Sequence, residues 1–505
     1  MWKGAAWREN QPIYGSLCLV PPSVEPVPRL LSSSSAVVHL CWALAQAPWS
    51  TARPAKHYIA AVYEHRSVLS PNPLDLTSCQ QALKLMKQNL DIYEQQVMAA
   101  AQKGVQIIVF PEDGIHGFIF TRTSICPFLD FMPSPRLVRW NPCLEPFWFN
   151  DTEVLQCLSC MAIKGQMFLV ANLGTKQPCL RSDPRCSHDR RYQFNTNVLF
   201  SHNGNLVACY RKHNLYFEAA FDIPAHVDLV NFDIPFVGQF GMFTCLDIPF
   251  FQPAIQLLRD SEVKHIVYPM TLMNQLPLLA AIEIQKAFQS AFGVSVLAAN
   301  IQHPTLGMSD SGIHTPLKSF WYHDMDNSEG YLIIAQIATN PLGLVGIENA
   351  TSETDPSHNK FLKILTGHLS CERDTQEVHC EEAAKWNMKA PPTFHSEMMY
   401  DNFILVPVWG KEGYVQVCSN GFCCHLLYER PTLSKELYFL GVFDGLHIVH
   451  GTYYIQVCAL VKCGGLNFDT CGQEISEAQG LFDFHLWGNF IISYIFPLFL
   501  TSGYP

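Results

Sequence analysis

The chain has 505 residues, of which 48% are hydrophobic and 15% charged, and its formal net charge at pH 7 is −11. This length suits two or three domains of about 100–200 residues each. The acidic balance, with a pI near 6.0, argues against nucleic acid or an anionic membrane as a partner, because either would need a basic surface. No apolar run reaches the ~18–20 residues needed to cross a bilayer, so we expect no transmembrane segment.

The first 55 residues are expected to be a leader. They begin with a stretch that is rich in Pro and Ser and lacks hydrophobic periodicity. The short apolar run Ala36–Leu44 is followed by Ala45-Gln46-Ala47, a small-x-small cleavage pattern that is typical of the end of a secretory signal. The region before this run is longer than usual for such a signal. Two glycosylation sequons, at Asn150 and Asn349, also favour export.

Nineteen cysteines are a high number, and eight of them lie beyond residue 370. Their clustering in a loop-rich segment indicates disulfides formed in an oxidising compartment. Zinc is the alternative, because His368, Cys371, His379 and Cys380 lie close together, but their spacing lacks the paired CxxC arms of a usual site. We therefore expect no metal. The odd total leaves at least one thiol free, and Cys245 is the candidate.

Hydrophobic periodicity from residue 56 onward predicts strands that alternate with helices. Tyr58–Tyr63 has the length of an apolar strand, and residues 78–102 repeat apolar side chains at helical spacing. Val105–Phe110 is a second β-prone run. A further helix at Val154–Lys164 and a strand at Met167–Asn172 repeat the order.

Residues 192–211 predict a hairpin, with Asn203-Gly204 as a two-residue turn at its tip. Strands are expected at Gln239–Cys245 and His265–Tyr268. A helix at Gln275–Phe292 is then expected to lead to a strand at Val294–Ala299. This alternation predicts a mixed α/β sandwich over residues 56–340. Residues 341–395, with many Gly, Pro, Asn, Thr and Ser, are expected to form a connector, and the aromatic and β-branched runs of residues 396–505 a smaller β-rich domain.

Three polar residues follow predicted strands: Glu112 after VQIIVFP, Lys212 within ACYRKHN, and Cys245 at the end of QFGMFTC. Amide hydrolysis needs a nucleophile, a proton shuttle and a positive group for the developing oxyanion. The pattern predicts Cys245 as the nucleophile, Glu112 as the proton acceptor and donor, and Lys212 as the cation that stabilises thiolate and oxyanion. Amides of a helix that begins soon after Cys245 would add positive charge.

Each of the three residues also has a plainer interpretation. A Cys at a strand end is usually a small core residue. A Glu after Phe-Pro is normally a solvated loop charge, and a Lys between Arg and His normally belongs to a basic surface cluster. Spacing alone leaves both interpretations open.

The stretches FPEDGIHGF, YRKHNLYFE and GMFTCLDIPFFQPA resemble the Glu–Lys–Cys motifs of the nitrilase, or carbon–nitrogen hydrolase, superfamily. Longer stretches, such as NLDIYEQQVMAAAQKGVQIIVFPEDGIHGF and FHSEMMYDNFILVPVWGKEGY, are similar to its secreted biotinidase and pantetheinase branch. The resemblance runs from about residue 57 to 502. It implies an αββα-sandwich catalytic domain with a smaller β-rich C-terminal domain, and the catalytic roles given above for Glu112, Lys212 and Cys245.

The resemblance also implies a function. The expected reaction is hydrolysis of biotin amides, meaning biocytin and biotinyl-peptides, to free biotin by a secreted enzyme without a metal or other cofactor. A pantetheine hydrolase and a secreted paralogue with impaired catalysis are the alternatives.

The chain departs from the family pattern at three positions near the expected site. Leu246 stands where the family usually has Phe, Pro249 where it has an aliphatic residue, and Leu272 where it has Trp before Met-Asn. The chain also ends at Pro505, short of a further β-segment, so we expect a truncated C-terminal domain. These departures predict correct chemistry with reduced efficiency.

Overall fold

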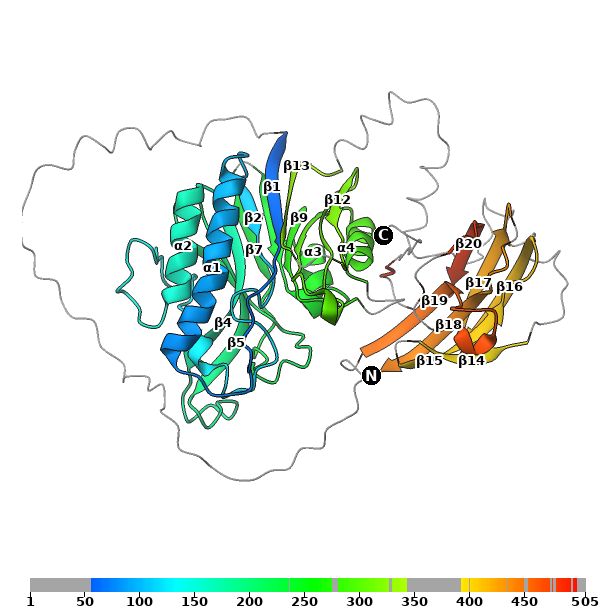
Figure 1. Ribbon diagram of the computed structural model, residues 1–505, viewed down its shortest axis with the longest axis horizontal. Coiled ribbons are helices and arrows are strands. Elements are labelled where there is room, and N and C mark those ends of the chain that lie inside the picture. The colour runs from blue at the N-terminus through cyan, green and yellow to red at the C-terminus, as the bar shows by residue number, and fades with distance from the viewer. Residues whose placement is uncertain are drawn as a thin grey trace, which may run out of the picture.

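The computed structural model describes residues 56–235, 237–274, 280–326, 329–342, 392–398, 400–432, 434–448, 453–472, 475, 478–491 and 494–496. They form a sandwich of two sheets with helices on its outer faces, and a smaller β-rich C-terminal region with two further sheets (Figure 1). The expected leader, most of the expected connector and the zinc alternative at residues 368–380 lie outside the described residues.

The first sheet has seven strands in the order β13-β1-β2-β4-β5-β6, with β3 beside β4. The strands are β1 (His57–Glu64), β2 (Ile107–Val109), β3 (Asp130–Phe131), β4 (Phe168–Pro178), β5 (Arg191–Phe200), β6 (Leu206–Arg211) and β13 (Tyr331–Ala338). β1, β2 and β4 run parallel, so their carboxyl ends lie at the same edge of the sheet. β5 and β6 form the predicted hairpin beside them.

The second sheet has six strands in the order β12-β11-β10-β9-β8-β7. The strands are β7 (Val230–Ile234), β8 (Gly238–Met242), β9 (His265–Pro269), β10 (Ser295–Ala299), β11 (Ser311–His314) and β12 (Ser319–Tyr322). β8, β9 and β10 are parallel to one another. This parallel centre delivers the residues that follow β8 and β9 to one edge.

Helices cover both outer faces, which gives the predicted αββα order (Figure 1). α1 (Cys79–Ala101) and α2 (Glu153–Gly165) lie on the first sheet, and α3 (Gln256–Asp260) and α4 (Ala281–Phe292) on the second. Side chains of β1 alternate between the two cores: Tyr58 and Val62 pack between the sheets, whereas Ala61 and Tyr63 pack under α1. No helix among the described residues is long and apolar enough to cross a membrane.

Most predicted elements are confirmed, with shifted ends. α1 begins after Ser78, whose side chain forms a reciprocal capping box with Gln81. α4 begins at Ala281, and residues 275–279, predicted as its first turn, lie outside the described part of the chain. β7 was not predicted.

The predicted two-residue turn at Asn203-Gly204 is wrong. The hairpin closes through the five residues 201–205, and only Gly204 of the pair has a positive φ, of 84°. Contacts from outside the hairpin account for this: Asn141 donates to the Asn203 carbonyl at 2.7 Å, and the Ser159 hydroxyl donates to the Gly204 carbonyl at 2.7 Å. Tertiary contacts thus override the local turn preference.

The C-terminal region is β-rich, as predicted. One sheet contains β14 (Phe394–Met398), β15 (Asp401–Pro407), β18 (Tyr438–His447) and β19 (Tyr453–Lys462), and the other β16 (Glu412–Ser419), β17 (Phe422–Glu429) and β20 (Asp483–Gly488). Val406, Val417, Leu426 and Leu440 form the core between them. The ring of Tyr453, on β19, lies 5.5 Å from the ring of Phe250, which is five residues after Cys245.

Five disulfides join described cysteines: Cys143–Cys160, Cys179–Cys186, Cys418–Cys423, Cys424–Cys458 and Cys463–Cys471. The last three confirm the expected pairing for six of the eight late cysteines, and the other two, Cys371 and Cys380, lie outside the described residues. Cys245 is a free, buried thiol, as predicted.

Candidate active site

The three predicted residues meet at the edge where the parallel strands of both sheets end. Glu112 lies three residues beyond β2, Lys212 directly follows β6, and Cys245 lies three residues beyond β8. The Lys212 ammonium donates to Glu112 Oε1 at 2.7 Å, and both side chains lie close enough to the Cys245 thiol to shift its pKa. All three residues are almost fully buried, so a solvated loop Glu and a surface Lys are excluded.

The backbone at Cys245 has an unusual conformation. Its φ is +42°, in the left-handed region that non-glycine residues rarely occupy. Cys245 is the first residue of a 3₁₀ turn, Cys245–Asp247, and a π-helical turn, Phe251–Ile255, leads directly into α3. Helical structure thus begins soon after Cys245, as predicted, but first as a single 3₁₀ turn.

Asp247 ties this turn to the loop that carries Lys212. Its carboxylate accepts hydrogen bonds from the Tyr210 hydroxyl at 2.6 Å, the Thr244 N–H at 3.1 Å and the Asn214 N–H at 3.0 Å. Burial raises the pKa of Asp247 to about 6, although these hydrogen bonds favour its charged form. The nucleophile and the cation are thus fixed relative to each other through one buried carboxyl group.

Sequence reasoning missed Glu218, a second carboxylate at the site. It accepts a hydrogen bond from the Lys212 ammonium and another from the Tyr216 N–H at 3.2 Å, so Lys212 bridges two carboxylates. Glu218 lies only six residues after Lys212, within the stretch YRKHNLYFE. The signal was a second acidic residue in the same motif.

Thr271, directly beyond β9 and Met270, was also missed. Its N–H donates to Glu112 Oε2 at 2.9 Å, and its hydroxyl donates to the Glu112 main-chain carbonyl at 2.6 Å. These bonds leave Glu112 little freedom to rotate. The strand-end argument that found Cys245 would have found Thr271 as well, since β9 is the neighbour of β8.

The charges set the resting state of the nucleophile. Burial raises the pKa of Cys245 well above its usual value, Glu112 adds to this, and the nearby Lys212 offsets it only in part. Burial also raises the pKa of Glu112, while Lys212 lowers it and Glu218 raises it further. Burial lowers the pKa of Lys212, but the two carboxylates outweigh this and the net shift is upward. These directions favour a protonated Cys245 thiol next to the Glu112 carboxylate in the resting site.

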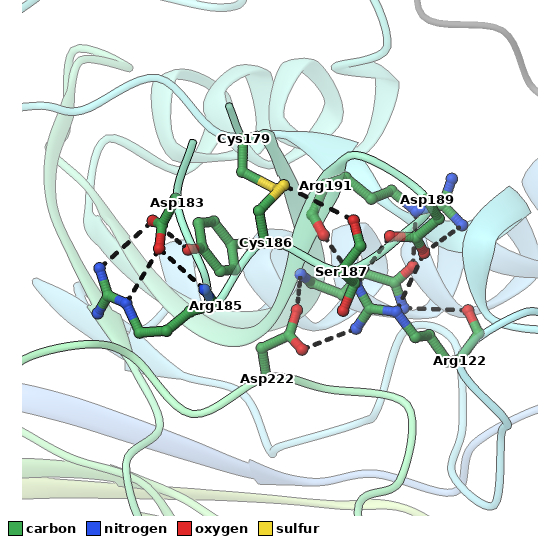
Figure 2. Close-up of a disulfide and its surroundings, with 11 residues drawn as sticks. Arg122, Cys179, Asp183, Arg185, Cys186, Ser187, Asp189, Arg191 and Asp222 are labelled. Atoms are coloured by element: carbon green, nitrogen blue, oxygen red, sulfur yellow. Dashed lines mark hydrogen bonds and ion pairs between the residues drawn. A yellow bond between two sulfur atoms is a disulfide. The ribbon is translucent and has the colours of Figure 1, made fainter. Parts of the chain in front are cut away.

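Arg122 forms ion pairs with Asp189 and Asp222 (Figure 2). The Arg122 guanidinium donates to both carboxylate oxygens of Asp189, at 3.0 and 3.1 Å, and to Asp222 at 2.8 Å. Asp189 lies in the loop next to the Cys179–Cys186 disulfide, and Asp222 lies four residues after Glu218. We call Arg122, Asp189 and Asp222 the Arg122 clamp.

The chain was compared with known proteins. The family model "Carbon-nitrogen hydrolase" matches residues 75–281 and the "Vanin C-terminal domain" model matches residues 392–505. Mouse (Mus musculus) biotinidase is 81% identical over 89% of this chain and 87% of its own length, and human (Homo sapiens) biotinidase is 78% identical over 89% and 83%. The chain belongs to the biotinidase and pantetheinase branch of the carbon–nitrogen hydrolases. It is an enzyme that acts on amides.

A more distant relative supports the same family. Mouse pantetheinase is 40% identical over 88% of this chain and 82% of its own length. Among solved structures, an amidase from Nesterenkonia sp. is 18% identical and covers 59% of this chain and 98% of its own, with a TM-score of 0.38.

The three positions that were expected to depart from the family pattern have different surroundings. Leu246 is buried in the turn after Cys245, and Pro249 is half-buried beyond it. Leu272 is half-buried against the inter-sheet core, and Asn300 holds its backbone by accepting from the Leu272 N–H and donating to its carbonyl, both at 3.0 Å. The backbone at position 272 is therefore fixed whatever side chain it carries.

The described residues contain no group of His, Cys, Asp and Glu side chains that could hold a metal ion. Of the two predicted glycosylation sites, Asn150 is exposed and Asn349 lies outside the described residues.

Proposed function

We propose that this enzyme hydrolyses biotin amides, such as biocytin and biotinyl-peptides, to free biotin through a thioester on Cys245. The observation that carries the proposal is the buried Glu112–Lys212 ion pair beside the Cys245 thiol, in a chain that is 78–81% identical to the biotinidases of mouse and human. Pantetheine is the weaker candidate substrate, since identity to the pantetheinase of mouse is 40%.

The first half of the reaction forms the acyl-enzyme. Glu112 accepts the thiol proton as the Cys245 sulfur attacks the substrate carbonyl, because the raised pKa of Cys245 keeps the resting thiol protonated. The Lys212 ammonium stabilises the oxyanion that develops on the carbonyl oxygen. Glu112 then gives its proton to the departing amine, the carbon–nitrogen bond breaks, and a thioester remains.

The second half releases the acid. Glu112, again a carboxylate, accepts a proton from a water molecule that attacks the thioester carbonyl. The carbon–sulfur bond breaks, the proton returns to the sulfur, and the free acid leaves. Glu218 does not exchange protons in this scheme. It balances the charge of Lys212 and holds its Nζ in place.

The test is a direct assay of biocytin and pantetheine hydrolysis by wild type, Cys245→Ala and Glu112→Gln. We expect biotin release from biocytin, none from Cys245→Ala, and slow turnover by Glu112→Gln with a thiol that still alkylates. Mass analysis of acid-quenched enzyme should find the biotinyl group on the peptide that contains Cys245. A Cys245→Ala variant with near wild-type turnover would contradict the mechanism, and preference for pantetheine would contradict the substrate.

We also propose that the protein is secreted and carries glycans at Asn150 and Asn349. The five disulfides and the exposure of Asn150 support this. Protein from a eukaryotic secretory host should shift in mass on glycosidase treatment, and Asn150→Gln should remove part of the shift. Retention of the unmodified chain inside the cell would contradict the proposal.

A further inference from the structure

A buried asparagine lies between the two carboxylates of the site. The Asn195 side chain, on β5, places its Nδ2 2.8 Å from Glu112 Oε1 and 2.8 Å from Glu218 Oε2. The two N–H groups of one amide are therefore divided between the two carboxylates. The main-chain carbonyl of Asn195 accepts a hydrogen bond from the main-chain N–H of Lys212 at 2.9 Å. Asn195 therefore contacts the side chains of Glu112 and Glu218 and the backbone of Lys212.

Further hydrogen bonds fix which way the Asn195 amide faces. The Asp113 N–H, which can only donate, donates to Asn172 Oδ1 at 3.0 Å. Asn172 Nδ2 must then face β5, where it donates to Asn195 Oδ1 at 2.6 Å and to Asn197 Oδ1 at 2.9 Å. At the other end, Asn197 Nδ2 donates to the Phe243 carbonyl at 3.3 Å, which can only accept. We call Asn172, Asn195 and Asn197 the asparagine relay.

The direction of the relay follows from its ends. Oxygen and nitrogen of an Asn side chain are normally assigned from the hydrogen bonds around them. Here a main-chain N–H starts the relay, and carboxylates and a main-chain carbonyl end it, so a flip of any member would set two acceptors or two donors face to face. Asn195 is fully determined as a donor toward Glu112 and Glu218.

Buried asparagines often only satisfy neighbouring backbone groups, and such a residue would contribute stability alone. Asn195 differs because its donors go to carboxylates that also bind Lys212. Two carboxylates that share one ammonium repel each other, and an N–H donated to a carboxylate favours its charged form. Loss of these donors would therefore change the protonation of the site and its geometry.

We propose that Asn195 is a positioning residue that holds Glu112 and Glu218 apart on either side of Lys212, and that Asn172 fixes the orientation in which it does so. The proposal deepens the function given above, because Glu112 is the proton acceptor there. It assigns to the asparagine relay the task of keeping Glu112 ready to accept the proton of the Cys245 thiol.

The test compares Asn195→Ala, Asn172→Ala and the double variant with Thr196→Val as the matched control. Thr196 lies on β5 between Asn195 and Asn197, is equally buried, and bonds the Thr175 hydroxyl at 2.7 Å, away from the carboxylates. For each variant, kcat and KM are measured from pH 4 to 10. The charge of Glu112 also affects the pKa of Cys245 in the absence of substrate. Alkylation of Cys245 by iodoacetamide is therefore followed from pH 4 to 10 by peptide mass analysis.

We expect Asn195→Ala to lower kcat by about ten- to a hundredfold with little change in KM, and to move the acid limb of kcat/KM to higher pH. Asn172→Ala should do the same to a smaller extent, and the double variant should be no worse than Asn195→Ala, since Asn172 acts through Asn195. Thr196→Val should lower thermal stability without moving the acid limb. Asn195→Ser, which keeps one donor, should lie between wild type and Asn195→Ala and serves if the alanine variant does not fold.

The proposal is overturned if Asn195→Ala and Asn195→Ser keep the wild-type pH profile, if Thr196→Val moves it equally, or if the effects of Asn172→Ala and Asn195→Ala add in full. The alkylation profile separates this outcome from a wrong substrate. If the wild-type enzyme is inactive on biotin amides but Asn195→Ala still moves the alkylation profile of Cys245 to higher pH relative to wild type, the proposed function is refuted and the asparagine relay is supported.

Discussion

The Tyr268 hydroxyl, on β9, donates a hydrogen bond of 2.6 Å to the main-chain carbonyl of Cys245. Both groups are buried, and the bond lies at the turn where Cys245 has its left-handed backbone. The neighbouring strand thus helps to hold the nucleophile in a conformation that its own backbone does not favour.

We expect Tyr268→Phe to lose about 1–3 kcal/mol of unfolding free energy, because a buried carbonyl loses its partner, and to lower kcat further than the stability loss explains. Tyr58→Phe is the control, since the Tyr58 hydroxyl bonds His265 on the same strand, away from the turn. Urea unfolding and steady-state kinetics on both variants check this. Equal losses of activity from the two would mean that the bond has no special role at the nucleophile.

Glu218→Gln should change the pH dependence in the direction opposite to Asn195→Ala. The charge of Glu218 raises the pKa of both Glu112 and Cys245, after the larger effect of burial. Its removal lowers both pKa values, so the acid limb of kcat/KM and the alkylation profile of Cys245 should move to lower pH. We expect kcat to fall by about tenfold or more, because Lys212 loses a partner. A shift to higher pH would contradict this charge assignment.

Arg122→Met removes the Arg122 clamp. Because one guanidinium donates to Asp189, Asp222 and the Arg191 carbonyl, we expect a loss of about 1–3 kcal/mol in unfolding free energy and a lower kcat. Arg185→Met is the matched control, since the Arg185–Asp183 pair lies on the surface and such pairs contribute about 0–1 kcal/mol. Calorimetry and kinetics on the two variants test the difference. Equal effects would show that the clamp is an ordinary surface pair.

Glu64 should make stability fall as pH rises. Burial raises its pKa to about 8, and hydrogen bonds from Ser309 and Ser311 oppose this only in part. Between about pH 4.5 and 8 the folded protein therefore holds a proton that the unfolded chain has lost, and the free energy of unfolding declines by up to about 1.4 kcal/mol per pH unit. Glu64→Gln should flatten this decline, whereas Glu94→Gln, at an exposed carboxylate of α1, should not. An unchanged slope in Glu64→Gln would refute the assignment.

Leu272→Trp should raise kcat/KM on biocytin. The neighbouring Thr271 bonds Glu112, and Asn300 fixes the backbone of Leu272, so a larger side chain adds apolar area beside the site without moving the loop. Each 1.4 kcal/mol gained corresponds to about tenfold. Leu317→Trp, at an exposed position on the surface, is the control. Unchanged or lower efficiency in Leu272→Trp would remove position 272 as the cause of any weakness.

The sequence predicted the members of the site that follow strands, because parallel strands bring their carboxyl ends together. Glu112, Lys212 and Cys245 were found in this way. Glu218 lies in a turn without periodicity, and its position depends on contacts with Lys212, six residues before it, and with Asn195 on β5. Asn195 lies within β5, where the sequence alternates polar and apolar residues as in a strand with one solvent-exposed face. Only its hydrogen bonds to Asn172 on β4 and to Glu112 and Glu218 in the loops distinguish it.

The high pKa of the buried Cys245 thiol has a consequence for folding. Disulfides form and exchange through thiolates, which attack existing sulfur–sulfur bonds. A chain with five disulfides among its described residues must form them in the presence of its own reactive cysteine. Once the two sheets close over it, that cysteine is protonated and shielded from water, so it stays out of the exchange. Burial of Cys245 thereby protects the disulfides from attack by the enzyme's own nucleophile.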